Sequence, residues 1–378
     1  MSTPDPTTLT PPPMIRVNRV GTDVKLVNGN SPWGDGFAAL RAAAAAELDG
    51  VNVRTLDELA PTLDTGLLDD FADLATELGL YIEMGVGKVN PYMTAELPRI
   101  RTLGGGSYLR GMERMIETCA SYGWTETWTA VGGYKPYPGI FFTDRFRTDT
   151  DWADQLDATE AFLHRLAPSL RANAVRLNLE THEEITTFEL LRLVESVGDD
   201  VLGICLDPGN LAVRAEPPIE GIRRVAPFVR TTQLRDAALW RNPDGTLSRF
   251  LAPCGEGVID WDEALEILLT ANPDLDLTIE GIGPVRAEML LHTDDPTWRR
   301  GHPDLDDDAL TELYLLAEQY EHRAAAGFAL TAGQLRDLPP GAAAHDTFVA
   351  TSAAHLRERM HARLGTPTPS TDTKENWS

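Results

Sequence analysis

Strand-like and helix-like segments alternate along almost the whole of this 378-residue chain. Short apolar runs predict strands, and each is followed by a longer stretch with apolar residues at helical spacing. The eight predicted strands cover residues 24–28, 50–53, 80–84, 124–131, 175–180, 201–206, 229–234 and 275–280. Because strands that alternate with helices form parallel sheets, and eight such units in one domain close on themselves, we expect an α/β fold, the (β/α)8 or TIM barrel.

An open, doubly wound sheet is the other way to arrange alternating strands and helices. Such a sheet would carry a glycine-rich phosphate-binding loop directly after its first strand. The residues at that place, Asn28 to Gly34, contain no GxGxxG pattern, which favours the barrel.

The same patterns divide the chain into segments. Residues 1–13 are rich in Ser, Thr and Pro and are expected to form a disordered tail, as are residues 365–378. We expect the barrel domain to span residues 14–326, with a helix at 309–325 as the last outer helix. Residues 327–364 contain helical patterns but no clear strand, which predicts a helical extension packed on the barrel or on a partner.

The charge of the chain argues against one class of partner. The formal net charge is −25, and lysine occurs only at Lys25, Lys88, Lys135 and Lys374. Because such an acidic chain repels phosphate backbones, we expect no nucleic-acid partner.

Other features bear on where the protein works. No apolar stretch approaches the length of a membrane span, and no basic segment followed by an apolar run marks a signal peptide. The three cysteines are far apart and include no CxxC pair, which argues against a disulfide framework or a zinc-thiolate site. We therefore expect a protein of the reducing cytoplasm without a membrane partner.

Polar residues end several of the predicted strands, where the active sites of barrels are built. They are Glu83 at the end of the third strand, Glu180 and His182 at the end of the fifth, Asp207 at the end of the sixth, Gln233 and Asp236 at the end of the seventh, and Glu280 at the end of the eighth. Asn210 follows Asp207 closely along the chain. Within this set we expect Asn210, Glu83 and Asp236 to contact a substrate.

Three of these residues, Glu180, Asp207 and Glu280, would project where the mouth of the barrel narrows. Their carboxylates would repel one another, and a divalent cation removes that repulsion. Gln233 can add a carbonyl oxygen, and a site made only of oxygen ligands suits Mg or Mn better than Zn. The alternative is that each residue caps a following helix, which is the usual role of a single residue such as Asp207.

His182 is the only one of the eight histidines that lies just past a predicted strand. In an extended segment residues i and i+2 face the same side, so His182 would share a face with Glu180. A neutral imidazole near physiological pH is a suitable general base for a substrate held by the metal. A purely structural histidine is the alternative.

Taken in order, these motifs resemble the xylose-isomerase-like TIM-barrel superfamily, the sugar phosphate isomerase/epimerase family. The resemblance rests on Leu177 to His182, Leu206 to Asn210, Gln233 to Asp236, Gly255 to Trp261 and Ile279-Glu280. It implies that Glu180, Asp207 and Glu280 bind Mn, Mg or Co. The fourth ligand of the family is typically a histidine, where this chain has Gln233, and position 210 is often histidine, where it has Asn210. In the family's epimerases the two metal-bound glutamates, here Glu180 and Glu280, also form the acid/base pair.

The motif Glu180-Thr181-His182 resembles one branch of this superfamily more closely, the large subunits of C-glycoside deglycosidases. This resemblance implies cleavage of a 3-keto glycoside by elimination, with His182 as the base and a small β-rich partner subunit. The aromatic segment from Trp124 to Phe142 would then stack on a flat aglycone, although a hydrophobic cluster under a long loop is an equal alternative.

All of these readings share one chemical step, the removal of a proton next to a carbonyl of a sugar or glycoside. Isomerisation or epimerisation returns the proton, whereas a lyase expels a leaving group, and the sequence leaves this choice open. A non-catalytic sugar-binding or scaffold subunit is the main alternative. An AP-endonuclease-like activity is disfavoured because the chain lacks a richer histidine set and a basic surface. We expect an oligomer.

Overall fold

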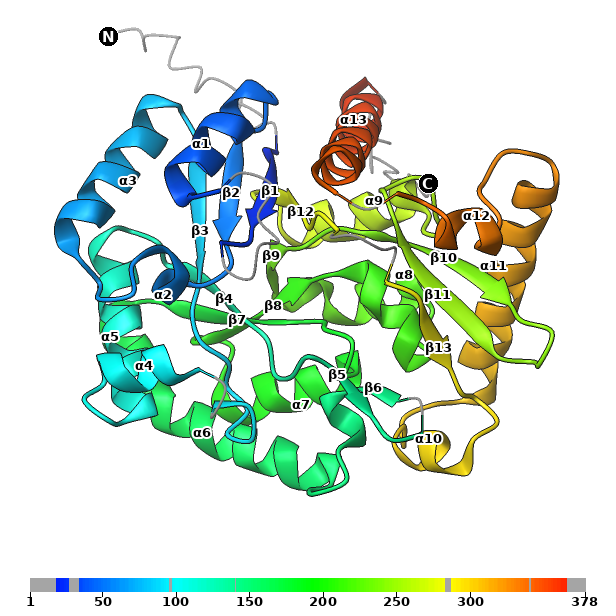
Figure 1. The fold of residues 1–378 in the computed structure, drawn as a ribbon, viewed down its shortest axis with the longest axis horizontal. Coiled ribbons are helices and arrows are strands. Elements are labelled where there is room, and N and C mark those ends of the chain that lie inside the picture. Colours follow the sequence, from blue (N-terminus) through cyan, green and yellow to red (C-terminus); the bar gives the residue numbers. More distant parts are fainter. Residues whose placement is uncertain are drawn as a thin grey trace, which may run out of the picture.

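The computed structural model describes residues 18–26, 34–94, 97–139, 141–282, 287–339 and 341–365. Eight parallel strands form its main sheet (Figure 1). In spatial order they are β12 (Leu277–Ile279), β1 (Val20–Val24), β2 (Gly50–Val53), β3 (Tyr81–Gly85), β4 (Glu126–Thr129), β7 (Arg176–Glu180), β8 (Leu202–Leu206) and β9 (Val229–Thr232). A bond of 2.7 Å from the Leu234 amide to the Thr278 carbonyl joins the β9 side to β12, which closes the sheet and confirms the predicted barrel.

Helices follow the barrel strands at nearly all predicted places. They are α1 (Gly36–Ala45), α2 (Leu56–Leu59), α3 (Thr65–Glu77), α4 (Pro98–Leu103), α5 (Tyr108–Ser121), α6 (Trp152–Asn173), α7 (Thr187–Val197), α8 (Pro218–Val225) and α9 (Trp261–Ala271). In α5 the buried residues Met112, Met115, Ile116 and Cys119 recur at helical spacing, and Ser107 caps the first turn. None of the helices described is both long and apolar enough to cross a lipid bilayer.

The outer helix of the eighth unit is not the predicted one. Residues 309–325 do form a helix, α11 (Asp307–Ala325), but α11 packs on strand β10 outside the barrel. The helix beside β1, β12 and α9 is α13 (Ala342–Gly365), which lies within the expected extension. Its Phe348 and Leu356 belong to the same apolar core as the barrel strands. In the structure, α11 therefore packs outside the barrel core, and that core includes residues of α13 beyond residue 326.

A second, three-stranded antiparallel sheet was not predicted. It consists of β10 (Asp236–Arg241), β11 (Leu247–Ala252) and β13 (Met289–Leu291). All three strands contact η3 (Pro208–Arg214), the short 3-10 helix after β8, so this sheet lies at the mouth of the barrel. The remaining elements are the hairpin β5 (Tyr134–Tyr137) and β6 (Phe141–Thr143), the 3-10 helices η2 (Asp144–Phe146) and η4 (Ala226–Phe228), and the helices α10 (Pro296–Arg300) and α12 (Ala332–Arg336).

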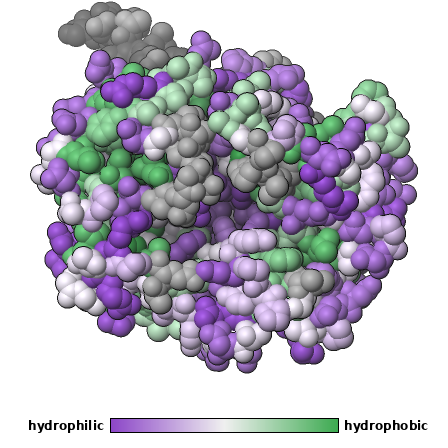
Figure 2. All heavy atoms as spheres, in the orientation of Figure 1, coloured by the Kyte–Doolittle hydropathy of each residue, from purple (hydrophilic) through white to green (hydrophobic). Residues whose placement is uncertain are grey.

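The first strand lies four residues before its predicted position, because β1 spans Val20–Val24 rather than 24–28. Its interior carries Thr22 and Asp23, both buried, so it lacks the apolar run that the prediction sought. Residues 27 and 28, the expected tail at 1–13 and all of the expected tail at 365–378 except Gly365 lie outside the described residues. On the face shown in Figure 2, hydrophilic residues surround a hollow near the middle of the molecule.

Candidate active site

Three carboxylates meet at the mouth of the barrel, as the sequence predicts. Glu180 is the last residue of β7, whereas Asp207 and Glu280 directly follow β8 and β12. One oxygen of each carboxylate lies within 4.8 Å of the others. Because adjacent parallel strands end at the same edge, the topology brings together residues that are 100 positions apart in the sequence.

The triad has the properties of a site for a hard divalent cation. Glu180 accepts a 3.2 Å hydrogen bond from the Trp128 indole at Oε2, whereas its buried Oε1 has no hydrogen-bond partner. Burial raises the pKa of Asp207 to about 7, which shows how poorly this environment tolerates its charge. A cation would bind the free oxygen of Glu180 and offset the negative charge of the triad. The all-oxygen donor set suits Mg or Mn.

Two basic residues that the sequence analysis did not single out also contact the triad. The Arg235 guanidinium contacts Asp207 and lies 2.7 Å from Oε2 of Glu280, while Lys25 Nζ lies 2.7 Å from Oε1 of Glu280 and 3.2 Å from Asp23. Against the effect of burial, Arg235 and Lys25 hold the pKa of Glu280 well below its usual range. The rarity of lysine was the available signal for Lys25, whose position directly after β1 was hidden because the first strand was predicted at residues 24–28.

Gln233 and Asn210 lie beside the triad in different ways. Gln233 donates from Nε2 to the Asn52 side chain, 3.3 Å away in the barrel interior. Asn210 donates to Asp207 at 2.6 Å and accepts from Arg235 at 3.3 Å. Asp207 also accepts from the Gly209 amide at 3.0 Å, so this carboxylate both caps η3 and joins the triad.

His182 is fixed by a carboxylate that the sequence analysis overlooked. Its Nδ1 lies 2.5 Å from Oε2 of Glu184, and the other oxygen of Glu184 accepts from the Gly132 amide. Against the effect of burial, Glu184 and Glu180 raise the pKa of His182 to about 9. The two carboxylates therefore favour the protonated imidazole, whereas the sequence analysis expected a neutral base.

The remaining two predicted residues lie in other surroundings. Glu83 points into the barrel, where it accepts from Thr278 at 2.9 Å and from Asn52 at 3.3 Å. Asp236 is fully buried and accepts from the amides of Gly255 and Ile259 and from the indole of Trp261. These contacts favour structural roles over the substrate contacts expected for both residues.

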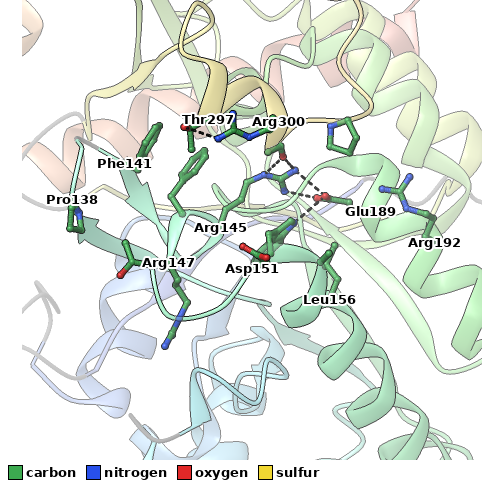
Figure 3. A pocket seen from close by; sticks show the side chains of 16 residues that line it. Pro138, Phe141, Arg145, Arg147, Asp151, Leu156, Glu189, Arg192, Thr297 and Arg300 are labelled. Atoms are coloured by element: carbon green, nitrogen blue, oxygen red, sulfur yellow. Dashed lines mark hydrogen bonds and ion pairs between the residues drawn. The ribbon is translucent and has the colours of Figure 1, made fainter.

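The aromatic segment of residues 124–142 borders a cavity of about 640 Å³ that lies apart from the triad (Figure 3). The cavity lies between the β5–β6 hairpin, the start of α6, α7 and α10. Arg145, in its wall, forms two bonds of 2.8 and 3.0 Å with Glu189 (Figure 3). Phe141 stacks on Phe146 with ring centroids 4.1 Å apart, so the rings form the hydrophobic cluster that was the alternative to aglycone stacking.

A closed (β/α)8 barrel with a carboxylate triad at the strand ends defines the class of this protein. The sequence model of the xylose isomerase-like TIM barrel family matches residues 40–302, and the chain belongs to this family.

Individual relatives agree with this assignment. The chain is 33% identical over 108 residues to 3-oxo-isoapionate decarboxylase of Pectobacterium atrosepticum, a match that covers 28% of this chain and 39% of that enzyme. The chain thus spans about two fifths of the length of this curated relative.

Solved structures share the fold at low sequence identity. A D-allulose 3-epimerase from Methylomonas sp. superposes with a TM-score of 0.54 and 15% identity, covering 92% of this chain and 100% of that one. A xylose isomerase-like barrel protein from Mycobacterium smegmatis, solved in complex with magnesium, gives a TM-score of 0.53 at 17% identity and covers 80% and 98%. At these identities the likeness shows the fold alone.

Proposed function

We propose that this protein is a divalent-metal-dependent enzyme that removes a proton next to the carbonyl of a sugar or keto-sugar. The observation that carries the proposal is the placement of His182. Its Nδ1 is bound to Glu184, its neighbour Glu180 belongs to the carboxylate triad, and its Nε2 makes no hydrogen bond with the described residues. That free ring nitrogen is the atom available to a substrate.

Each residue has a separate task in this mechanism. Glu180, Asp207 and Glu280 would hold the cation, with Gln233 as the expected fourth ligand after a change of side-chain direction. The bound cation supplies charge that polarises the substrate carbonyl. His182 takes the proton from the adjacent carbon through Nε2, and Glu184 holds the ring in place and balances the charge of the imidazolium. His182 would act as the base in its neutral form, which a cation at Glu180 would favour by offsetting the charge of that carboxylate.

The fate of the resulting enolate distinguishes several reactions. Return of the proton at another face or carbon gives epimerisation or isomerisation, with Glu180 and Glu280 as an alternative acid/base pair. Loss of a group on the next carbon gives the β-elimination expected of a C-glycoside deglycosidase-like lyase. For that branch we also propose the small β-rich partner subunit and a cytoplasmic location.

The partial match to 3-oxo-isoapionate decarboxylase supports decarboxylation as a further candidate reaction. Loss of carbon dioxide from a 3-oxo acid leaves an enolate of the same kind as proton removal does, so the same cation site would serve it.

One observation favours the non-catalytic alternative. Arg235 already pairs with two of the three triad carboxylates, which lowers their need for a metal. A sugar-binding barrel without metal would retain this arrangement, and it would bind sugars without exchanging their protons.

Deuterium exchange separates the two functions. With Mn²⁺ in D₂O, and with ketohexoses and 3-keto glucosides as probes, we expect NMR to show deuterium entering at the carbon next to the carbonyl. His182→Gln should slow this exchange roughly 10²-fold or more, whereas His164→Gln, at an exposed position on α6, should not. Binding of a probe without exchange in the wild-type protein would support the scaffold function instead.

A further inference from the structure

Basic residues follow three consecutive strands on the side of the barrel mouth away from β7 and β8. Lys25 directly follows β1, Arg54 directly follows β2, and Lys88 lies three residues beyond the end of β3. The ends of parallel strands lie at one edge, so these side chains and the carboxylate triad share one opening. The mouth of the barrel therefore carries three basic residues beside the carboxylate triad.

Two of these three cations have no carboxylate partner. Lys25 forms ion pairs with Glu280 and Asp23. Among the residues that the structure describes, no carboxylate lies within ion-pair distance of Arg54 or Lys88. Both side chains are only partly buried, so a ligand can reach them. In a chain with a net charge of −25, such cations are unusual at the mouth of a barrel.

Both cations lie against the ring of Trp128, next to the catalytic residues proposed above. The Arg54 guanidinium carbon is 5.9 Å and Lys88 Nζ is 5.5 Å from the centre of this ring. The indole of Trp128 donates to Glu180 at 3.2 Å. Lys88 Nζ also donates to the Gly132 carbonyl at 2.8 Å, and the amide of the same residue binds Glu184, the partner of His182.

Contact with the ring of Trp128 compensates the positive charges of Arg54 and Lys88 only in part. Burial and the like charge of Arg54 lower the pKa of Lys88, and the nearby carboxylates of Glu184, Glu180 and Asp144 offset this effect only in part. The ring attracts each cation, but it neutralises neither and leaves most guanidinium N–H groups of Arg54 without an acceptor. An anion bound between the two cations would supply both negative charge and hydrogen-bond acceptors.

We infer that the substrate is an acidic keto-sugar whose carboxylate or phosphate binds Arg54 and Lys88 while its carbonyl lies at the carboxylate triad. This inference rests on the proposed function and adds the chemical class of its substrate. Arg54 and Lys88 are then specificity residues, and they hold the substrate carbon chain across Trp128 towards His182.

Calorimetric titration with three matched probes tests the inference. D-fructose is the neutral probe, 2-keto-D-gluconate carries a carboxylate in place of its first hydroxymethyl group, and D-fructose 1-phosphate carries a phosphate there. We expect the Mn²⁺-loaded wild-type protein to bind one acidic probe at least about tenfold more tightly than fructose. The acidic probe that binds more tightly identifies the source of the charge.

Variants then locate the charge recognition. Lys88→Met and Arg54→Met should each reduce the preference for the acidic probe about tenfold, with Mn²⁺ affinity and thermal stability retained, and Lys88→Arg should keep much of it. Arg41→Met, which removes an exposed arginine of α1, serves as the matched control and should change nothing.

Equal affinity for all three probes, no binding of either acid, or an unchanged preference in both Met variants would overturn the inference. The same titrations are run without Mn²⁺, so charge preference is measured even where no metal binds. If Mn²⁺ binds at the triad but the acids have no advantage, this inference fails and the proposed function stands. If Mn²⁺ does not bind, the proposed function fails on its own.

Discussion

At the scale of single residues, the site depends on how buried carboxylates divide their tasks. Glu180 keeps a free oxygen for a cation, whereas Glu184 uses both oxygens, one on His182 and one on the Gly132 amide. The second arrangement resembles the carboxylates that orient catalytic histidines in other enzymes. In the proposed mechanism Glu184 therefore acts through His182 and is a positioning residue.

Replacing Glu184 by Gln removes the charge but keeps the shape of the side chain. We expect kcat to fall roughly 10²-fold, because the imidazole loses the group that orients it and stabilises its protonated form. The affinity for Mn²⁺ should stay within twofold, since Glu184 is outside the triad. The exposed Glu195→Gln variant provides the comparison, and a parallel loss of metal binding in Glu184→Gln would contradict a positioning role.

The buried carboxyl group of Glu83 should make the free energy of unfolding depend on pH. Burial raises its pKa to about 8, above the ordinary value near 4.5. A raised pKa means that the folded state holds this proton more tightly than the unfolded chain does, so the contribution of Glu83 to stability is fully present at low pH and is lost as pH rises towards about 8. Glu83→Gln should therefore reduce the fall in the free energy of unfolding between about pH 5 and 8, as measured by urea denaturation. The exposed Glu77→Gln variant should leave the slope unchanged, and a slope in Glu83→Gln equal to that of the wild type would refute the assignment.

At the scale of elements, helix positions were predictable but their packing partners were not. The apolar spacing of α11 and α13 shows that each helix buries one face, yet it does not say which sheet that face covers. The antiparallel strands β10 and β11 were missed although the turn between them, Asn242-Pro243-Asp244-Gly245, is a readable signal. Both strands are short apolar runs like the barrel strands, so the sequence pattern alone does not distinguish them from barrel strands.

The placement of α13 in the barrel core predicts unequal effects of the same substitution. Leu356, on α13, is fully buried, whereas Leu315, on α11, has 52% of its surface exposed. Leu356→Ala should lower the free energy of unfolding by about 2–5 kcal/mol, since it removes buried methyl groups and leaves a cavity. Leu315→Ala should change it by less than about 0.5 kcal/mol. Equal effects of the two substitutions in chemical denaturation would show that α13 is not part of the core.

At the scale of the whole molecule, the sequence allowed the barrel and its triad to be predicted because both depend on local signals. The ends of the three strands that carry the triad are visible in the sequence, and closure of eight parallel strands then brings Glu180, Asp207 and Glu280 together. The cations at the mouth were not predictable in the same way. Arg235 reaches the triad and Lys88 reaches Trp128 through side-chain directions, which only the folded chain determines. Glu83 and Asp236 show the converse, since both were predicted at strand ends, whereas Glu83 lies in the middle of β3, Asp236 begins β10, and both side chains point into the protein.

A metal titration tests the central claim most directly. The account predicts that the wild-type protein binds about one Mn²⁺ or Mg²⁺ per chain by calorimetry, and that Asp207→Asn binds none. The surface variant Asp200→Asn, whose carboxylate pairs with Arg171, should bind like the wild type. Stoichiometric binding lost only in Asp207→Asn would support a metal-dependent enzyme. An absence of binding in the wild-type protein, with Arg235 as the lasting partner of the triad, would contradict it.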